Sequence, residues 1–137
     1  MSKKKIKVDW IWHYIANGNV CDCCNEVENS LPQFMCNAHT HGMNKYNHKD
    51  FQVVLDTDTK TIGYLLNTMG LRVQAGERFS NGDIVSGLFE DCDVRLLEVP
   101  EGDRTVLRLV IPDGKNRFPE DPTCDYPYNQ QVVFTTV

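Results

Sequence analysis

A single stripe of apolar residues at helical spacing, in the middle of the chain, limits the possible folds more than any other feature of the sequence. The stripe consists of Ile62, Leu65, Leu66, Met69 and Val73. These positions follow an i, i+3, i+4, i+7, i+11 pattern, which places all of the side chains on one face of an α-helix. Because such a face has to be buried against another element, the chain needs a second layer that covers this helix.

The segments on both sides of the helix have the composition of strands, so the second layer is expected to be a sheet. Strands are predicted at about 35–43, 51–55, 84–89, 94–99, 105–111 and 130–136. The pair at 94–99 and 105–111 flanks Gly102, and the short loop between them predicts a hairpin.

The N-terminal segment also shows helical spacing. Val8, Ile11, Trp12 and Ile15 follow Asp9, which is a candidate N-cap, and they predict a short helix. The predicted fold class is therefore α+β. It consists of a mostly antiparallel sheet of about five or six strands, one main helix packed on that sheet, and a short N-terminal helix.

Length and charge restrict the domain organisation and the partners of the chain. A chain of 137 residues is long enough for one hydrophobic core. We therefore predict a single domain over 1–137, with a basic disordered tip (1–7), a Cys-rich loop (21–34) and a core of sheet and helix (35–137). The net charge is −5 even though the tip is rich in lysine. Nucleic acid is therefore an unsuitable partner, because binding to phosphates needs a basic surface.

The sequence contains neither an apolar segment long enough to span a membrane nor a recognisable signal peptide. We therefore expect a cytoplasmic protein without a membrane partner. In that compartment the six cysteines are expected as thiols or metal ligands rather than as disulfides.

Four residues in the first third of the chain have the spacing of a zinc site. They are Cys21, Cys24, Cys36 and His39, which form a C-x2-C pair and a following C-x2-H pair. Zinc prefers thiolate and imidazole ligands in a tetrahedral arrangement, and its binding energy can order a polar loop. We therefore predict a structural zinc ion at these four residues, with Cys23, His41 and His48 as alternative ligands. The alternative without a metal, in which the cysteines are buried as small apolar residues, stays open.

His39 and His41 form a second pattern. Alternate residues of a strand point to the same face, so the two imidazoles are expected side by side. A compact catalytic metal site is therefore an alternative, with His39, His41 and His48 as ligands and Asp50 or Asp22 as the base.

Several stretches resemble one known family. They are His39-Thr40-His41-Gly42-Met43, His48 through Leu55, Leu66-Asn67 with the glycines that follow, and Pro112 through Glu120 with Cys124 and Gln130. Together these stretches resemble the bacterial domain-of-unknown-function family 4262 over about residues 36–131. The resemblance implies the same order of strands, helix and hairpin, and it implies no activity.

Departures from the family pattern affect the predicted site. His39 stands where the family pattern has Tyr, and Asp50 stands where it has Glu, whereas His48 matches the histidine of the family. The Cys-rich loop lies outside the pattern. The resemblance therefore implies that the zinc site belongs to this chain or to a subgroup of the family.

Three hypotheses of function follow. The leading one is a small interaction or regulatory domain without catalytic turnover, whose Cys-rich loop is fixed by zinc and whose partner is an unknown protein or small molecule. The second is the metal-dependent hydrolase that uses the paired histidines. The third is a small barrel that binds a flavin-type cofactor, which rests on the Thr-x-Gly sequence at 40–42 and on the many short strands.

Overall fold

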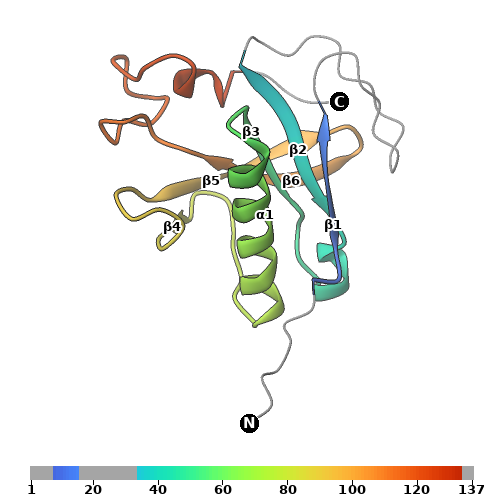
Figure 1. Cartoon of the computed structure of the whole chain (residues 1–137). Helices are drawn as coiled ribbons and strands as arrows, with labels where there is room; N and C mark the ends of the chain where they lie inside the picture. The colour runs from blue at the N-terminus through green and yellow to red at the C-terminus, as the bar shows by residue number, and fades with distance from the viewer. Residues whose placement is uncertain (1–7, 16–33, 134–137) are drawn as a thin grey trace.

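The computed structural model describes residues 8–15 and 34–133, and Figure 1 shows their arrangement. The predicted basic tip and nearly all of the predicted Cys-rich loop lie outside these residues. The elements are β1 (Ile11–Ile15), β2 (Met35–His41), the 3-10 helix η1 (Met43–Tyr46), β3 (Phe51–Leu55), α1 (Thr59–Gln74), β4 (Ile84–Val85), β5 (Val94–Glu101), β6 (Arg104–Val110) and the 3-10 helix η2 (Tyr128–Gln130).

The strands form one six-stranded sheet in the order β1-β2-β3-β6-β5-β4. Neighbouring strands are antiparallel except for β3 and β6, which pair in parallel at the centre of the sheet. Parallel strands need a long connection. Here that connection contains α1, β4 and β5.

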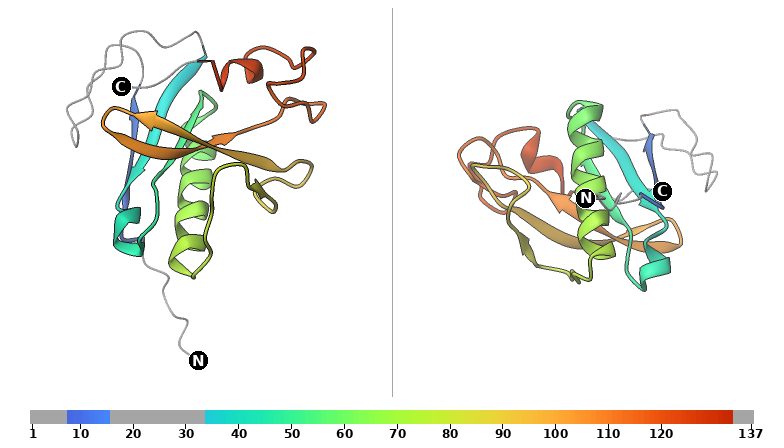
Figure 2. Two further views of the ribbon diagram at one scale, coloured as in Figure 1. Left: turned by 180° about the vertical axis from the view of Figure 1, so that it is seen from behind. Right: turned by 60° about the horizontal axis from the view of Figure 1, so that its bottom comes forward.

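The helix α1 lies across one face of the sheet, and Figure 2 shows the strands in front of it when the molecule is seen from behind. The predicted apolar stripe is buried along its whole length, from Ile62 to Val73. The helix begins at Asp58, whose side chain accepts a hydrogen bond of 2.7 Å from the backbone N–H of Thr61. The main helix of the prediction is therefore confirmed.

Two tryptophans fix β1 and the residue before it against α1. Trp10 packs over Gly70 and Trp12 packs over Gly63, where a Cβ atom would lie within 3.0 Å of the indole in each case. Trp10 also donates a hydrogen bond of 3.1 Å from Nε1 to Asn67 Oδ1. The two glycines therefore allow the rings to approach the helix closely.

Two parts of the predicted fold are wrong. The N-terminal segment Ile11–Ile15 is the strand β1 rather than a helix, because its β-branched and aromatic residues favour strands and its backbone pairs with β2. The sheet is mixed rather than mostly antiparallel, because β3 and β6 run in parallel.

The boundaries of two predicted strands also differ. The strand expected at 84–89 is only the two-residue β4. No strand forms at 130–133, where the 3-10 helix η2 and a turn replace the beginning of the predicted last strand. The strands at 51–55 and in the hairpin around Gly102 are confirmed.

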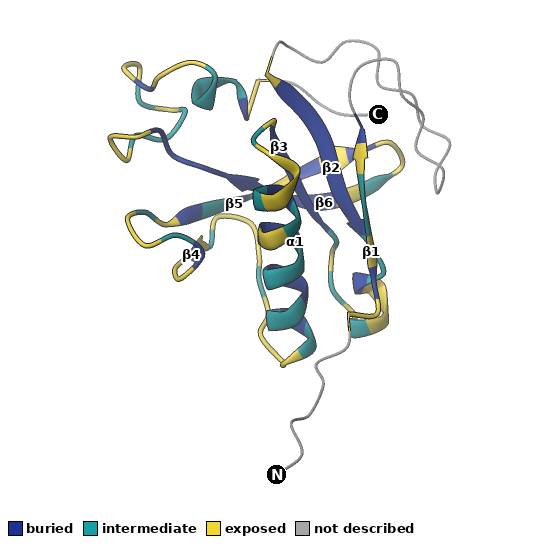
Figure 3. Ribbon diagram, viewed as in Figure 1, coloured by how far each residue is buried: buried dark blue, intermediate teal, exposed yellow. Residues whose placement is uncertain are grey.

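Burial is strongest at the centre of the sheet. Figure 3 shows β2 and β6 buried along most of their length, whereas the outer side of α1 is exposed. The central strands therefore bury residues on both faces, and the face opposite α1 has to accommodate several polar side chains. Among the described residues, no helix is long and apolar enough to cross a membrane.

Candidate functional site

Polar side chains form a row across four strands on the sheet face opposite α1. The strand register places His13 of β1 opposite His39 of β2, His39 opposite Gln52 of β3, and Gln52 opposite Arg108 of β6. Opposed residues of neighbouring strands point to the same face of a sheet. His39, Gln52 and Arg108 are buried, so this row is an ionisable and polar layer inside the protein.

Three histidines at one end of this row form a cluster. His41 follows His39 at i+2 in β2, and His13 lies on the neighbouring strand β1. The ring centroids are 4.8 Å apart for His39 and His41, 5.3 Å for His13 and His41, and 5.9 Å for His13 and His39. We refer to His13, His39 and His41 as the histidine cluster. His39 is buried, whereas His13 and His41 are partly exposed.

Hydrogen bonds fix the orientation of His39. Its Nδ1 lies 2.9 Å from Asn37 Oδ1 and 3.2 Å from Glu101 Oε2. Both of these oxygens accept hydrogen bonds from the amide of Gln52. Because they are acceptors, Nδ1 carries the proton and the lone pair of His39 is on Nε2.

Glu101 is a buried carboxylate held by an arginine. Arg104 donates from Nε to Glu101 Oε1 over 2.8 Å and from Nη1 to Asp50 Oδ2 over 3.0 Å. Asp50 also accepts hydrogen bonds from Thr40 Oγ1 and from the backbone N–H of Met43. One guanidinium therefore joins two carboxylates, of which Glu101 contacts His39.

The environment changes the ionisation of these groups. Burial, together with the neighbouring His41 and Arg104, lowers the pKa of His39 to about 3. Burial and Arg104 lower the pKa of His41 to about 4. Burial raises the pKa of Glu101, although Arg104 opposes that shift. Near neutral pH, His39 and His41 are therefore neutral imidazoles.

The structure does not bring Cys36 and His39 together, although both belong to the predicted zinc site. Cys36 is part of the hydrophobic core under α1, its Sγ is 3.7 Å from the carbonyl of Val53, and burial raises the pKa of its thiol. Its charged neighbour is Asp56, which accepts a hydrogen bond from Tyr14. His39 instead stacks on His13. His13 and Tyr14 are consecutive residues of β1 and point to opposite faces, so Cys36 and His39 lie on opposite sides of the sheet.

The structure also separates His48 from the paired histidines. His48 Nε2 accepts a hydrogen bond of 3.0 Å from the backbone N–H of Phe79, and its Nδ1 lies 2.8 Å from the carbonyl of Lys49. The ring contacts Phe51 and Phe79. With both nitrogens engaged, His48 has a structural role at the edge of the core.

The remaining predicted ligands Cys21, Cys23 and Cys24, and the predicted base Asp22, lie outside the described residues. Within residues 8–15 and 34–133, no group of three or more His, Cys, Asp or Glu side chains is already arranged to hold a metal ion. The zinc site with Cys21 and Cys24 therefore stays a prediction.

Sequence reasoning missed His13 and Glu101, which are the partners that give His39 its surroundings. His13 was assigned to a helix, where it would not face β2. Glu101 lies beside the turn of the predicted hairpin, where acidic side chains are usually exposed, yet it is only 2% exposed. The spacing within β5 could have indicated that Glu101 is buried. Val99 and Glu101 are two residues apart in one strand, so they share a face, and an apolar residue such as Val99 is expected to be buried.

Comparison with known proteins gives one match. The family model described as Domain of unknown function (DUF4262) matches residues 21–125. The match begins at residue 21 rather than near 36, so the shared region includes the Cys-rich segment, contrary to the resemblance drawn from the motifs. No curated protein and no solved structure matches the chain.

Proposed function

We propose that this chain, which belongs to the DUF4262 family of domains of unknown function, binds a divalent transition metal ion such as Zn²⁺ at the histidine cluster. The family itself supplies no activity. The proposal therefore rests on the geometry of His13, His39 and His41.

The spacing of the three rings is the observation that carries the proposal. Imidazoles bound to one tetrahedral zinc ion have Zn–N distances of about 2.0–2.1 Å, which places their ring centroids roughly 5 Å apart. The three centroid distances in the histidine cluster range from 4.8 to 5.9 Å. The rings are close enough to share an ion, and rotation of the His13 and His41 side chains has to turn a nitrogen of each toward the Nε2 side of His39.

The surroundings of His39 support this assignment. Histidine ligands commonly donate their other ring N–H to a carboxylate or carbonyl, which fixes the tautomer and the ring orientation. Asn37 and Glu101 provide such acceptors at Nδ1 of His39. Nε2 is therefore the nitrogen of His39 that would bind the ion.

His13 provides a further reason. Its Nε2 atom is buried and has no hydrogen-bond partner within the part of the chain that the structure describes. A buried polar atom without a partner carries a cost, and an ion is one way to satisfy it. A metal ion between the three rings would give His13 Nε2 a partner.

The number of ligands favours an accessible ion over an enclosed one. Structural zinc sites use four protein ligands, whereas sites with three leave a coordination position for water or a substrate. His13 and His41 are partly exposed, so the fourth position of the ion would face the surface. The geometry therefore favours a metal-binding domain that accepts an external ligand. The predicted hydrolase is compatible with this site once His13 replaces His48.

Isothermal titration of metal-free protein with Zn²⁺ tests the proposal. We expect saturation at one ion per chain, and we expect His13→Ala and His41→Ala to weaken binding more than about 100-fold, because each removes a direct ligand. His48→Gln is the matched control and is expected to bind as the unmodified chain does.

One double variant separates this site from the Cys-rich segment. Cys21→Ser/Cys24→Ser is expected to retain zinc binding. If this double variant loses the ion while His13→Ala and His41→Ala keep it, the ion is held by the thiols and the proposal is wrong. Absence of zinc binding by the unmodified chain would also overturn it.

A further inference from the structure

A groove lies at the end of the sheet where the C-terminal residues of the central strands β3 and β6 are found, away from the histidine cluster. It consists of three adjoining depressions with volumes of about 480, 400 and 250 Å³. The first shares Cys92 and Pro112 with the second, and it shares Leu55 and Tyr128 with the third. The three depressions therefore form one elongated surface that suits an extended chain more than a compact ligand.

The charged residues that line this surface all have the same sign. They are Asp56, Asp58, Glu90, Asp91, Asp93 and Asp113, and none of the lining residues is Lys, Arg or His. We refer to this surface as the acidic groove. Asp113 is already neutralised by Arg117. Glu90, Asp91 and Asp93 are exposed and form no ion pair with any described residue.

Exposed aromatic rings at one end of the acidic groove are an independent indication of a partner. Phe34 and Tyr126 are 53% and 52% exposed, and their ring centroids are 6.0 Å apart. Both line the third depression. Large aromatic side chains that stay exposed next to each other are typical of protein interaction surfaces.

The other end of the groove shows how a cation fits such a surface. Arg95 places its guanidinium carbon 4.6 Å above the ring centroid of Phe118, which lines the second depression. The same guanidinium pairs with the carboxylate of Glu120. A basic side chain is thus held by an aromatic face and a carboxylate together, which is the recognition that a Lys- or Arg-rich ligand needs.

We propose that the acidic groove docks a Lys- or Arg-rich extended segment of a partner protein. The carboxylates of Asp91 and Asp93 pair with basic side chains of this segment, and the exposed ring of Phe34, in the third depression, packs against the aliphatic part of a further basic side chain. This surface is separate from the histidine cluster and does not depend on metal binding.

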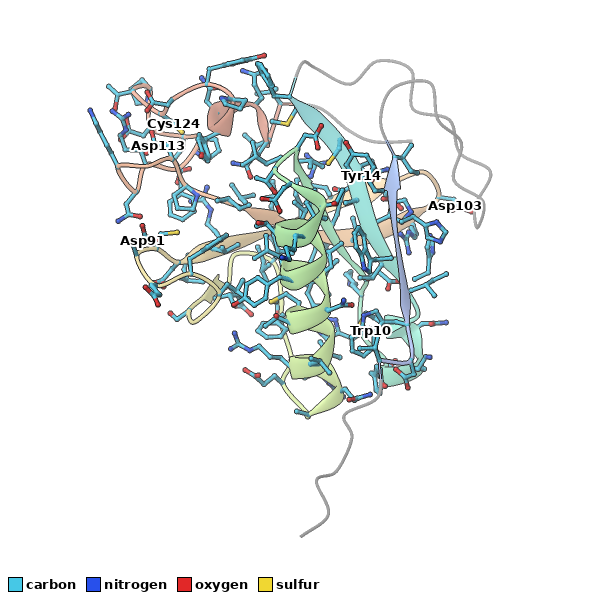
Figure 4. All side chains as sticks on the ribbon, viewed as in Figure 1. Trp10, Tyr14, Asp91, Asp103, Asp113 and Cys124 are labelled. Atoms are coloured by element: carbon cyan, nitrogen blue, oxygen red, sulfur yellow. The ribbon has the colours of Figure 1, made fainter. Side chains whose placement is uncertain are left out.

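Fluorescence anisotropy with a fluorescein-labelled oligolysine peptide tests the proposal on the full chain at low salt. Saturable binding is expected, and Asp91→Asn/Asp93→Asn is expected to weaken it roughly fivefold or more, since each exposed charge pair contributes a factor of about two to five. Asp103→Asn is the matched control. Figure 4 shows Asp103 on the opposite side of the molecule from Asp91 and Asp113, so this change should leave binding nearly unaltered.

Phe34→Gly tests the aromatic contribution without the risk of unfolding. Phe34 has a φ of 66°, a left-handed conformation that glycine adopts without strain. This variant is expected to melt like the unmodified chain and to bind oligolysine roughly two- to fivefold more weakly.

Three results would overturn the proposal. The first is a loss of binding in Asp103→Asn as large as that in Asp91→Asn/Asp93→Asn, which would show that the peptide is attracted by net charge alone. The second is oligoglutamate binding as tightly as oligolysine. The third is binding of spermidine that depends on Asp91 without any binding of oligolysine, which would indicate a site for small polycations.

Discussion

At the scale of single residues, Glu101 is the centre of the buried polar layer. It contacts His39, Gln52 and Arg104 while being only 2% exposed. Glu101→Gln keeps the shape of the side chain but removes its charge and leaves Arg104 with Asp50 as its carboxylate partner. Because breaking a buried ion pair is costly, we expect a loss of about 2–3 kcal/mol in the free energy of unfolding, measured with urea.

Glu98→Gln is the control for this change. Glu98 is also in β5, but it is exposed and lies 3.5 Å from Lys49. An exposed pair contributes little, so the control should lose less than about 1 kcal/mol. Equal losses in the two variants would show that Glu101 has no special role.

The lowered pKa of Asp113 leads us to expect that the protein loses stability in acid. Burial alone would raise the pKa of this carboxyl group, but the backbone N–H groups of Asp125, Arg117 and Lys115 and the guanidinium of Arg117 hold it well below its usual value. A group with a lowered pKa in the folded state stabilises the protein above its unfolded pKa, which is near 3.9. That stabilisation is lost as the pH falls toward the pKa of the folded state.

Asp113→Asn removes this contribution. We expect the variant to be less stable than the unmodified chain at pH 7 and the difference to shrink below about pH 4. Urea unfolding at several pH values measures both quantities. A stability difference that does not change with pH would contradict the role assigned to the ionised carboxylate.

At the scale of elements, the packing of Trp10 on α1 requires glycine at position 70, although alanine is normally preferred over glycine inside a helix. Alanine stabilises a helix interior by about 0.5–1 kcal/mol relative to glycine. At Gly70, however, a Cβ atom would lie 2.4 Å from Cζ2 of Trp10. Gly70→Ala is therefore expected to lower stability by about 1–3 kcal/mol, because it displaces a packed ring and its hydrogen bond to Asn67.

Thermal unfolding with Gly114→Ala as a control checks this expectation. A Cβ atom at Gly114 meets no heavy atom within 4 Å, so that substitution should be neutral or slightly stabilising. A higher melting temperature for Gly70→Ala would mean that the indole of Trp10 is not tightly packed there.

The elements that sequence analysis predicted well have local patterns. The buried stripe from Ile62 to Val73 and the hairpin around Gly102 each lie within one continuous stretch of sequence. The segment Ile11–Ile15 is too short for its spacing to distinguish a helix from a strand. Its pairing with β2 decided the outcome, and that pairing depends on residues more than twenty positions away.

At the scale of the whole molecule, Gln131 fastens the C-terminal segment to the centre of the sheet. Its side chain accepts a hydrogen bond from the backbone N–H of Ile111 and donates to the carbonyl of the same residue, and its own carbonyl accepts from Arg108. Gln131→Ala leaves the buried backbone groups of Ile111 without these partners. We expect a loss of about 1–3 kcal/mol in the free energy of unfolding.

Gln130→Ala is the neighbouring control. The side-chain amide of Gln130 donates to Asn129, which is its neighbour in the chain. Hydrogen exchange of the Ile111 amide reports the change directly, and it should become faster in Gln131→Ala and stay unchanged in Gln130→Ala. Unchanged protection in both variants would contradict the proposed fastening.

The candidate site is a property of the whole molecule, which explains why the sequence predicted only part of it. His39 and His41 are neighbours in one strand, and their shared face was predicted from that spacing. His13, Gln52 and Arg108 reach the same row through the strand order, which places β6 beside β3. No local pattern contains that order.

The parallel seam between β3 and β6 divides the described sheet into two sequence halves. The pairs of β1, β2 and β3 all precede the segment from Ala75 to Asp83, and the pairs of β4, β5 and β6 all follow it. A cut in that segment would therefore leave each antiparallel ladder complete in its own fragment. The two fragments meet at the β3–β6 pairing, beneath α1 and at the contact between Phe34 and Tyr126. The molecule is therefore suited to being split and reconstituted as two complementary pieces.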